Sequence, residues 1–312
     1  MVVVAAVAAV VVAAAAAPVF ANLDGILAAR RAAAAVGSSR SSYRSENDKS
    51  DQIMEFPQRT IAQIIDSERE MVLTAPQRYG MYYDTAFDCA MLFTQFLKSI
   101  DPDRWVFGSF LSLAKKHHTL ALFSTVRLHK VQALMNLRQT LEAGACAAFA
   151  IANPDHAHFV DTDEYGILDP VPAGKRYRWL DQNYPASSTA INEIKKQINM
   201  STAHANLIST HSTFRTDYEA GWFTAPFFDI EDEHYVKTDL WMIANAALTL
   251  LHFLYEVNEG RNVIKFVDNF WPLIQPLDQR SGALRAEMMA TDRVKRALEK
   301  DAARKAGATQ GG

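Results

Sequence analysis

The chain has 312 residues, of which 49% are hydrophobic and 21% are charged, a composition typical of a soluble globular protein rather than a disordered one. Its formal net charge of −3 gives no general attraction to nucleic acid or to acidic lipid. The charge is uneven, because residues 1–50 carry five basic and three acidic side chains, a surplus of +2 that leaves −5 on the rest of the chain.

The first fifty residues have a strongly biased composition. Residues 1–21 contain eight Val, ten Ala and no charged side chain, and a Ser/Arg-rich run follows up to Ser45. Three interpretations stay open: a targeting or export segment without the usual basic start, a marginal membrane anchor, and a low-complexity extension or mis-assigned start. The third interpretation predicts a cytoplasmic protein, and the first two predict an exported or membrane-anchored one.

The patterned part of the chain predicts an all-α fold. We expect a low-complexity segment, disordered or used for targeting, over residues 1–50, one helical domain over 51–305 and a flexible tail over 306–312. The domain has the pattern of a multi-helix bundle with a long proline-containing loop at about 154–188 and a short aromatic hairpin or loop at about 213–230. The helices are expected at Thr60–Leu73, Tyr79–Ile100, Arg104–His118, Leu120–Asn153, Thr189–Thr210, Glu231–Asn258, Arg261–Trp271 and Gly282–Lys305.

Several folds and cofactors are disfavoured by the pattern. No repeat of fixed period is visible, which argues against a solenoid, and no Gly-rich loop joins a strand to a helix, which argues against a nucleotide-binding sheet. Cys89 and Cys146 lie in apolar helical stretches without a second Cys or a His at metal-ligand spacing. We therefore expect reduced, buried thiols and neither a metal nor a cofactor.

Arg138 and Glu142 lie one turn apart in the most apolar predicted helix. Helical steps from Val131 trace a stripe in which these two residues carry the only charges. Charged side chains rarely enter a core unpaired, because their desolvation costs on the order of several kcal/mol per ion. The pattern therefore predicts a buried, mutually neutralised pair. It is either structural, or it consists of an anion-binding Arg138 beside a Glu142 that acts as a base or orients a His.

A second polar stripe lies on the predicted helix 189–210, where Ser201, His204 and His211 fall in line. A Ser three residues before a His can form a hydrogen bond with it. A nucleophilic triad, however, also needs a strained turn and an orienting acid, and the pattern shows neither. In the structural alternative, Ser201 helps to cap a helix and His204 is a packed histidine with a satisfied ring.

The last strong helix places Asn245 and His252 among hydrophobic residues, where each side chain needs a hydrogen-bond partner. Convergence of these residues with the other polar positions would give the bundle an interior polar network, which is either a specificity device or a site. The catalytic candidates, none in a complete motif, are His204, His211 and Glu142. The candidate ligand-binding residues are Arg138, Glu142, Ser201, His204, Asn245 and His252.

Three shorter patterns have both a functional and a structural interpretation. His156 and His158, with acids nearby, would ligate a metal on an extended loop, but a solvated acidic loop has the same composition. Residues 175–179 interleave bases with aromatics, as in nucleic-acid-binding patches and also in helix starts whose long side chains pack inward. Asp84 and Asp88 lie one turn apart, but two acids alone do not define an acid–base or two-metal site.

The Arg138-x-x-x-Glu142 element and the downstream Ser201-x-x-His204 element together resemble a group of uncharacterised bacterial all-α domains that are compared with HEPN-type and abortive-infection proteins. The resemblance spans about residues 79–258, and it implies a helical bundle with a polar core and a link to defence or stress. HEPN ribonucleases resemble one another in an Arg followed by four to six residues and then a His. No Arg of this chain has a His at that spacing, so the nuclease activity is not carried over.

These patterns favour a non-enzymatic helical module that acts by binding. The sequence does not identify its partner, for which a second copy of the chain or another protein is expected. The alternative is a hydrolase acting on nucleic acid, with His204 or His211 as general base and Arg138 or residues 175–179 holding phosphate. A helical domain tethered to a membrane through residues 1–21 is the third hypothesis.

Overall fold

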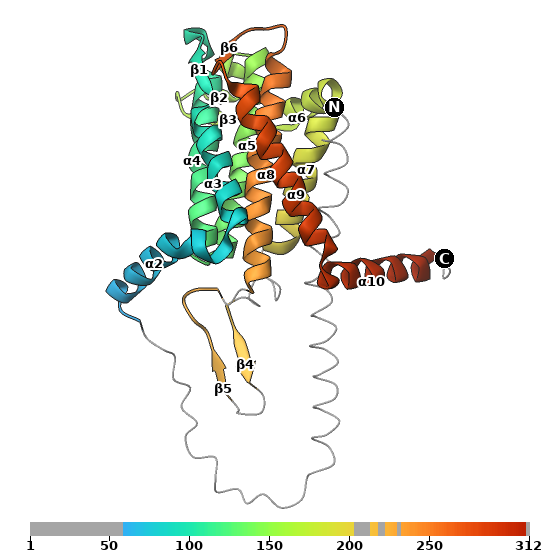
Figure 1. Cartoon of the computed structure of the whole chain (residues 1–312). Coiled ribbons are helices and arrows are strands. Elements are labelled where there is room, and N and C mark those ends of the chain that lie inside the picture. Colours follow the sequence, from blue (N-terminus) through green and yellow to red (C-terminus); the bar gives the residue numbers. More distant parts are fainter. Residues whose placement is uncertain (1–58, 203–212, 218–221, 230–231, 310–312) are drawn as a thin grey trace, which may run out of the picture.

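The computed structural model describes residues 59–202, 213–217, 222–229 and 232–309, and most of these residues lie in α-helices packed side by side (Figure 1). The predicted all-α multi-helix bundle is therefore confirmed. The predicted extension over residues 1–50 lies outside the described residues.

Helices α5 (Lys130–Ala152) and α8 (Glu233–Asn258) pack against each other in the core. Small side chains let them approach closely. A Cβ atom added at Gly144 would lie 2.5 Å from Cδ2 and 3.2 Å from Cγ of Leu250, which is itself fully buried. Interiors are packed as densely as organic crystals, so this approach sets the spacing of the helices around it. Further small, buried residues on the two helices are Ala143, Ala147 and Ala148 of α5, and Ala244, Ala246 and Ala247 of α8.

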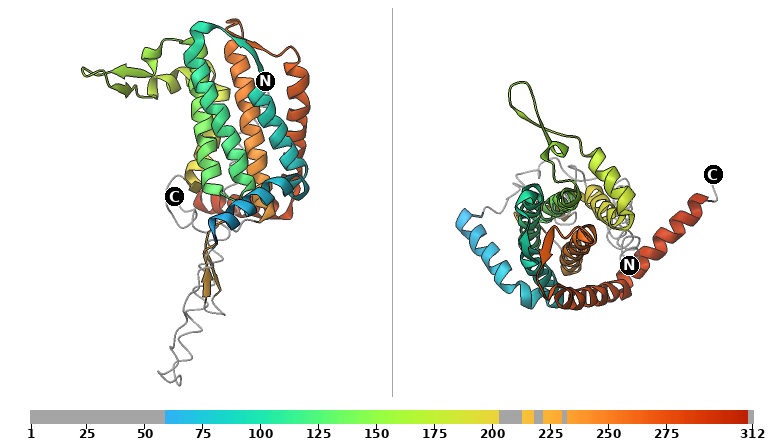
Figure 2. Two further views of the ribbon diagram at one scale, coloured as in Figure 1. Left: turned by 90° about the vertical axis from the view of Figure 1, so that its left-hand side faces the viewer. Right: turned by 90° about the horizontal axis from the view of Figure 1, so that it is seen from above.

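The remaining core helices surround this pair. Four of them pack on α8 and three pack on α5, so that α4 and α7 contact both (Figures 1 and 2). Their apolar side chains form one continuous hydrophobic cluster with those of α5 and α8. The helices on α8 are α3 (Met81–Gln95), α4 (Trp105–Val126), α7 (Pro185–Thr202) and α9 (Phe270–Ala290), and those on α5 are α4, α6 (Gly174–Asn183) and α7.

Two helices project sideways from one end of the bundle (Figures 1 and 2). These are α2 (Ile61–Tyr79) and α10 (Asp292–Thr309), and they leave the bundle on opposite sides. α2 begins with a complete capping box, in which Thr60 and Gln63 bond each other's backbone N–H groups, so its first turn does not depend on the bundle for hydrogen bonds. We call this end of the bundle, with α2 and α10, the arm end.

The connections between the described helices contain three pairs of short antiparallel strands. The pair β1 (Leu97–Ile100) and β6 (Ile264–Phe266) lies at the end of the bundle opposite the arms (Figure 1). Asn258 holds β6, because its Oδ1 accepts from the N–H groups of Val263 and Ile264 and its Nδ2 donates to the Ile264 carbonyl. The other pairs are hairpins, β2 (Val160–Thr162) with β3 (Leu168–Pro170) and β4 (Arg215–Asp217) with β5 (Trp222–Thr224).

Several predicted boundaries need correction. The break between α4 and α5 lies at residues 127–129, not near residue 119 as predicted. Leu128 makes this turn with a φ of +58°. The turn contains neither Gly nor Pro, so the sequence does not mark it. The helix predicted up to Ile100 ends at Gln95, where β1 takes over, and α10 continues to Thr309, into the predicted tail. The predicted aromatic hairpin exists as β4–β5, whereas the predicted helical segment 203–210 lies outside the described residues.

The other differences from the predicted elements lie in segments that contain prolines. The segment predicted as a loop at about 154–188 contains the β2–β3 hairpin and α6, and Pro185 opens α7, where a missing N–H costs nothing. Pro272 lies in the first turn of α9 for the same reason. Pro276 lies inside α9 and Pro76 inside α2, each within two turns of a helix end, so each helix continues past its proline.

Among the described residues, α8 is the one helix long and apolar enough to cross a membrane, and 72% of its most apolar window is buried inside the bundle. Its composition therefore serves contacts with the surrounding helices.

Gly144→Ala is expected to lower the free energy of unfolding by about 1–3 kcal/mol, because the new methyl group displaces the buried Leu250 side chain. Gly282→Ala is the matched control. That glycine lies in α9 with nothing within 4 Å of an added Cβ, so the change is expected to stabilise by about 0.5–1 kcal/mol through helix propensity. Urea unfolding measures both, and equal effects at the two positions would contradict the close approach.

Candidate functional site

The Arg138–Glu142 pair forms at the edge of the bundle. Arg138 Nε lies 3.1 Å from Glu142 Oε1, and the two side chains are 31% and 30% exposed. Arg138 also donates to Asn199 Oδ1 at 2.8 Å, and Lys195 Nζ lies 3.5 Å from Glu142 Oε1. The pair thus belongs to a partly solvated strip between α5 and α7, which corrects the prediction of a fully buried pair.

The predicted stripe of α5 lies only partly in the core. Val131 and Met135 on it are exposed, and Arg138 lies at the edge of the bundle. The buried members of the stripe are Leu134, Leu141, Ala145 and Phe149. α5 carries apolar residues on most of its circumference, so the pattern alone does not show which side faces inward.

The structure does not gather the predicted polar residues into one network. His252 Nε2 lies 2.9 Å from Asp278 Oδ2 at the interface of α8 and α9, whereas the Arg138–Glu142 pair is at the interface of α5 and α7. Asn245 is half-buried on α8. α8 is surrounded by other helices, so polar groups on it and on α5 are directed to different neighbours. The remaining candidates lie outside the described part: His204 and His211 entirely, and Ser201 as far as its side chain is concerned.

The hydrolase hypothesis stays a prediction, because its two candidate general bases, His204 and His211, lie outside the described residues. Its phosphate patch is helix α6, in which Arg176, Tyr177 and Trp179 are partly buried and Lys175 and Arg178 are exposed. The metal interpretation of the His156–His158 segment is not supported either. No three His, Cys, Asp or Glu side chains are grouped to hold a metal ion in the described ranges. Of the two acids on α3, Asp88 pairs with Arg280 at 2.6 Å.

Among the residues that the structure describes, His118 is the most deeply buried basic side chain, and sequence reasoning missed it. It lies on α4, where its ring centre is 5.4 Å from that of Phe93 in an edge-to-face arrangement. Its Nε2 is 3.0 Å from the carbonyl oxygen of Ile243 on α8. A carbonyl only accepts, so Nε2 carries the proton and donates. Desolvation lowers the pKa of His118 from 6.5 to about 4, partly offset by this hydrogen bond. His118 is therefore a neutral strut between two helices.

A signal for His118 exists in the sequence. It falls in phase with Phe107, Leu111, Ala114 and Ala121, all of which are buried on α4. The adjacent Lys115, Lys116 and His117 make this segment look like a solvated polar patch, which conceals that phase.

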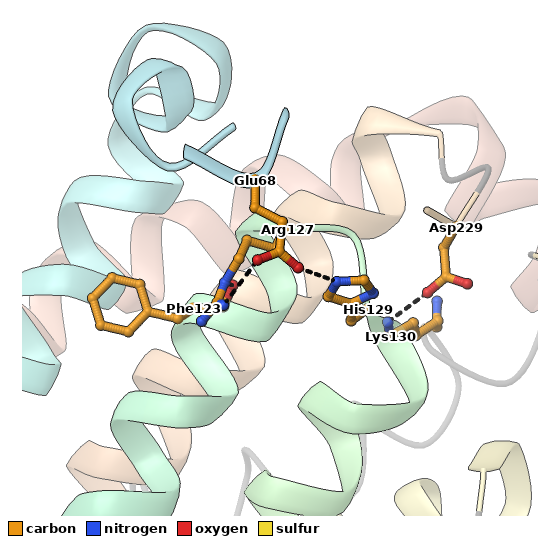
Figure 3. A network of polar contacts seen from close by, with 6 residues as sticks. All are labelled: Glu68, Phe123, Arg127, His129, Lys130 and Asp229. Carbon is orange, nitrogen blue, oxygen red and sulfur yellow. Dashed lines mark hydrogen bonds and ion pairs between the residues drawn. The ribbon is translucent and has the colours of Figure 1, made fainter. Parts of the chain in front are cut away.

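A network of charges joins separate segments at the arm end, around the α4–α5 turn (Figure 3). Glu68 of α2 accepts from His129 Nε2 at 2.8 Å and from Arg127 Nη1 at 3.4 Å. Arg127 Nε donates to the Phe123 carbonyl at 3.0 Å. The hydrogen bond from His129, followed by the charge and hydrogen bond of Arg127, holds the pKa of Glu68 below its usual value despite burial. Glu68 therefore ties α2 to the turn.

The second half of the network caps α5. The Lys130 N–H donates to Asp229 Oδ2 at 2.6 Å, and the Asp229 N–H donates to the Leu128 carbonyl at 2.9 Å (Figure 3). A carboxylate at this position satisfies a free N–H and complements the positive end of the helix dipole. Lys130 Nζ lies 3.6 Å from Asp239, whose pKa is raised mainly by burial and lowered in part by Lys130. These contacts fasten segments to one another.

The clearest feature available to a partner is the β2–β3 hairpin, which projects from the end of the bundle opposite the arms (Figure 2). Tyr165, Ile167 and Leu168 at its tip are 79%, 64% and 69% exposed. Large apolar side chains grouped in this way usually mark an interaction surface, unlike isolated ones. Exposed acidic residues accompany them, namely Asp161, Asp163, Glu164 and Asp169.

The tip of the hairpin is fixed by its own hydrogen bonds. Asp163 Oδ1 accepts from the N–H groups of Tyr165 at 2.9 Å and Ile167 at 2.7 Å. The Asp163 and Ile167 backbones also bond at 3.0 Å, and Gly166 supplies the positive φ of +78° that the turn requires. The backbone that carries the exposed side chains is therefore held by hydrogen bonds within its own turn.

The base of the hairpin is anchored on the bundle. Arg176 Nη1 donates to the carbonyls of His158 at 2.8 Å and Val171 at 3.1 Å, and its guanidinium lies 5.2 Å from the ring centre of Phe159. Phe159 in turn contacts Phe110 and Phe149, at 4.9 and 5.6 Å between ring centres. Arg176 thus positions the hairpin, whereas Lys175 and Arg178 are exposed, so the inward-packing interpretation holds for one of the three basic residues of this segment.

Comparison with known proteins finds no family model that matches the sequence, and neither the curated proteins nor the solved structures include a match. The HEPN-like resemblance therefore stays a prediction, and with it the link to bacterial defence or stress.

His118 is expected to make the protein less stable in mild acid. Its pKa is lower in the folded state, so the unfolded chain takes up a proton that the folded chain refuses between about pH 6.5 and pH 4. The stability contribution is complete above this window and is lost as the pH falls through it, by up to about 3 kcal/mol. His118→Gln keeps a donor for Ile243 but does not titrate. Urea unfolding above and below this pH window is expected to show that the variant loses less stability in acid than the wild type. An equal loss in the two proteins would contradict a buried, neutral His118.

Glu142→Ala is expected to cost at most about 1 kcal/mol, because the pair is partly solvated and Arg138 keeps Asn199. Leu141→Ala, one residue away and fully buried, is the control, with an expected loss of about 2–5 kcal/mol. Thermal melting compares the two. A loss for Glu142→Ala as large as that for Leu141→Ala would restore the interpretation of a fully buried pair.

Proposed function

We propose that this protein is a non-enzymatic interaction module that binds a partner protein through the tip of the β2–β3 hairpin. The observation that carries the proposal is the exposure of three neighbouring apolar side chains, Tyr165, Ile167 and Leu168, on a hairpin held away from the bundle.

Rigidity of the tip supports binding. Association costs free energy whenever loops and side chains must be ordered at the interface, and a preformed loop avoids much of this cost. Here Asp163 and Gly166 set the turn, and Arg176 and Phe159 fix its base. The backbone that carries the apolar side chains is therefore already ordered when a partner binds.

The chemistry of the tip defines the partner. Tyr165 offers a large ring with one polar group, the kind of residue that dominates protein interfaces, and the aliphatic pair fits an apolar recess. The surrounding acids favour a rim of Lys or Arg on the partner, and they repel phosphate groups. We therefore expect a protein with an apolar, basic-rimmed cleft rather than nucleic acid.

A photo-crosslinking amino acid at position 165 tests the proposal in the full chain, in a lysate of the source cells. The control position is Phe87, an exposed aromatic residue on α3. We expect one specific crosslinked protein from position 165, none from position 87, and displacement by a cyclised peptide of residues 159–171.

The same peptide with Asp163→Ala is the matched competitor, since it loses the bonds that fix the turn while keeping the apolar residues. We expect it to compete at least roughly tenfold less well, which corresponds to about 1.4 kcal/mol. Equal crosslinking from both positions, or equal competition by both peptides, would exclude a specific role for the hairpin.

A further inference from the structure

We propose that the partner of the hairpin also binds Trp105, at the start of α4, through a Lys or Arg side chain that lies over the indole ring. This inference rests on the proposed function, because it takes the β2–β3 hairpin as the first of two contacts with the same partner. It describes that partner as a protein with a basic segment beside its apolar cleft.

The exposure of Trp105 is the first observation. Its side chain is 60% exposed, although a Trp ring usually packs in a core or at an interface. In the described part of the chain, the Lys and Arg side chains that lie over aromatic rings lie over Phe and Tyr and not over Trp. Trp105 therefore has no cation of this described part on its ring.

Trp105 lies beside the base of the hairpin. Its ring centre is 6.3 Å from that of His156, which opens the short 3₁₀ helix His156–His158 before β2. The same helix α4 also holds the hairpin, because its Phe110 contacts Phe159 at 4.9 Å between ring centres. α4 therefore fixes the position of Trp105 relative to the hairpin, and both face a partner at the end of the bundle opposite the arms (Figures 1 and 2).

A second apolar side chain extends the surface around Trp105. Ile100 of β1 is 38% exposed, and its Cδ1 would lie 3.2 Å from a Cβ atom added at Gly108. Residues three positions apart lie on the same side of a helix, so Ile100 packs on the side of α4 that carries Trp105. We call Trp105 and Ile100 the Trp105 face.

Charge selects the kind of partner. Residues 99–105 and 153–174 together carry seven acidic side chains and one basic side chain, a net charge of −6, which leaves +3 on the rest of the chain. The one base, Arg104, is half-buried, whereas all seven acids are exposed. The acids are Asp101, Asp103, Asp155, Asp161, Asp163, Glu164 and Asp169.

This acidic surface favours a basic protein over the other candidates. A second copy of the chain would bring like charges together, and a nucleic acid would set its phosphates against the carboxylates. Surfaces of opposite sign, in contrast, attract each other and fix the register of a complex. We therefore expect Lys and Arg side chains on the partner opposite the Trp105 face.

The Trp105 ring gives these cations a specific contact. Indole is the aromatic ring that binds a cation most strongly, and the contact is stronger when water is excluded from it. Carboxylates come from both segments that meet at the ring. Asp101 and Asp103 precede Trp105 by four and two residues, and Asp155 Oδ1 lies 3.6 Å from His156 Nδ1. A guanidinium over the indole is thus flanked by negative charge.

Titration of the purified full chain with a fluorescein-labelled nona-arginine peptide tests this site without the natural partner. Trp105→Ala is expected to bind the peptide at least roughly fivefold more weakly than the wild type. Trp105→Phe keeps an aromatic face and is expected to lose less. The matched control is Phe87→Ala, which removes an exposed aromatic side chain from α3 and is expected to bind like the wild type.

The contribution of charge is tested by two pairs of substitutions with equal change in net charge. Asp101→Asn with Asp103→Asn removes carboxylates beside Trp105, and Asp101 makes no side-chain capping bond that this change would break. Asp66→Asn with Glu70→Gln removes two exposed carboxylates from α2 at the arm end. We expect weaker peptide binding for the first pair only, weaker wild-type binding at high salt, and unchanged circular dichroism spectra for all variants.

Three results would overturn the proposal: wild-type affinity in Trp105→Ala, equal losses for the two charge pairs, and no binding of nona-arginine to the wild type. A photo-crosslinking amino acid at position 105 is expected to capture the same protein as at position 165. Crosslinking from position 165 without an effect of Trp105→Ala on peptide binding would remove this inference alone. Peptide binding that depends on Trp105, without a specific crosslink from position 165, would remove the proposed function alone.

Discussion

The close approach of α5 to α8 at Gly144 and Leu250 is the contact on which the arrangement of the bundle depends. Small side chains bring these two core helices together, and the other helices then bury the remaining apolar surface around them. With 23 residues in α5 and a rise of about 1.5 Å per residue, the bundle core is about 35 Å long. The β2–β3 hairpin and the arm end therefore lie at opposite ends of the bundle (Figure 2).

Desolvation decides where the charges of this protein lie. The core tolerates an imidazole at His118 only in its neutral form, with its N–H bonded to a carbonyl. Charged pairs occur where water reaches them, at the α5–α7 strip, at the α8–α9 interface and around the α4–α5 turn. In these places they fix segments such as α2 to the bundle. The polar groups expected to form an interior site are therefore distributed over several interfaces that hold the fold together.

The fold class and the long helix α8 were predictable from the sequence, because apolar periodicity over many residues and the capping Asp232 mark it clearly. The turn at Leu128 was not, since its positive φ is imposed by packing rather than by Gly or Pro. The candidate site was harder still. Arg138 and His118 both follow apolar positions, and only the packing partners of α4 and α5 show which of them is buried. The Asp163–Gly166 turn of the hairpin did carry a signal in its Asp and Gly residues.

The resulting account is of a helical bundle with a preformed turn at the tip of its β2–β3 hairpin, which we propose as the contact with a partner protein. Hydrogen exchange followed by mass spectrometry, on the full chain and on its Asp163→Ala variant, tests this account most directly. The account predicts slow exchange of the Tyr165 and Ile167 amides in the wild type, because both donate to Asp163 Oδ1, and faster exchange of both in the variant. Equal exchange of these amides in the two proteins would contradict it.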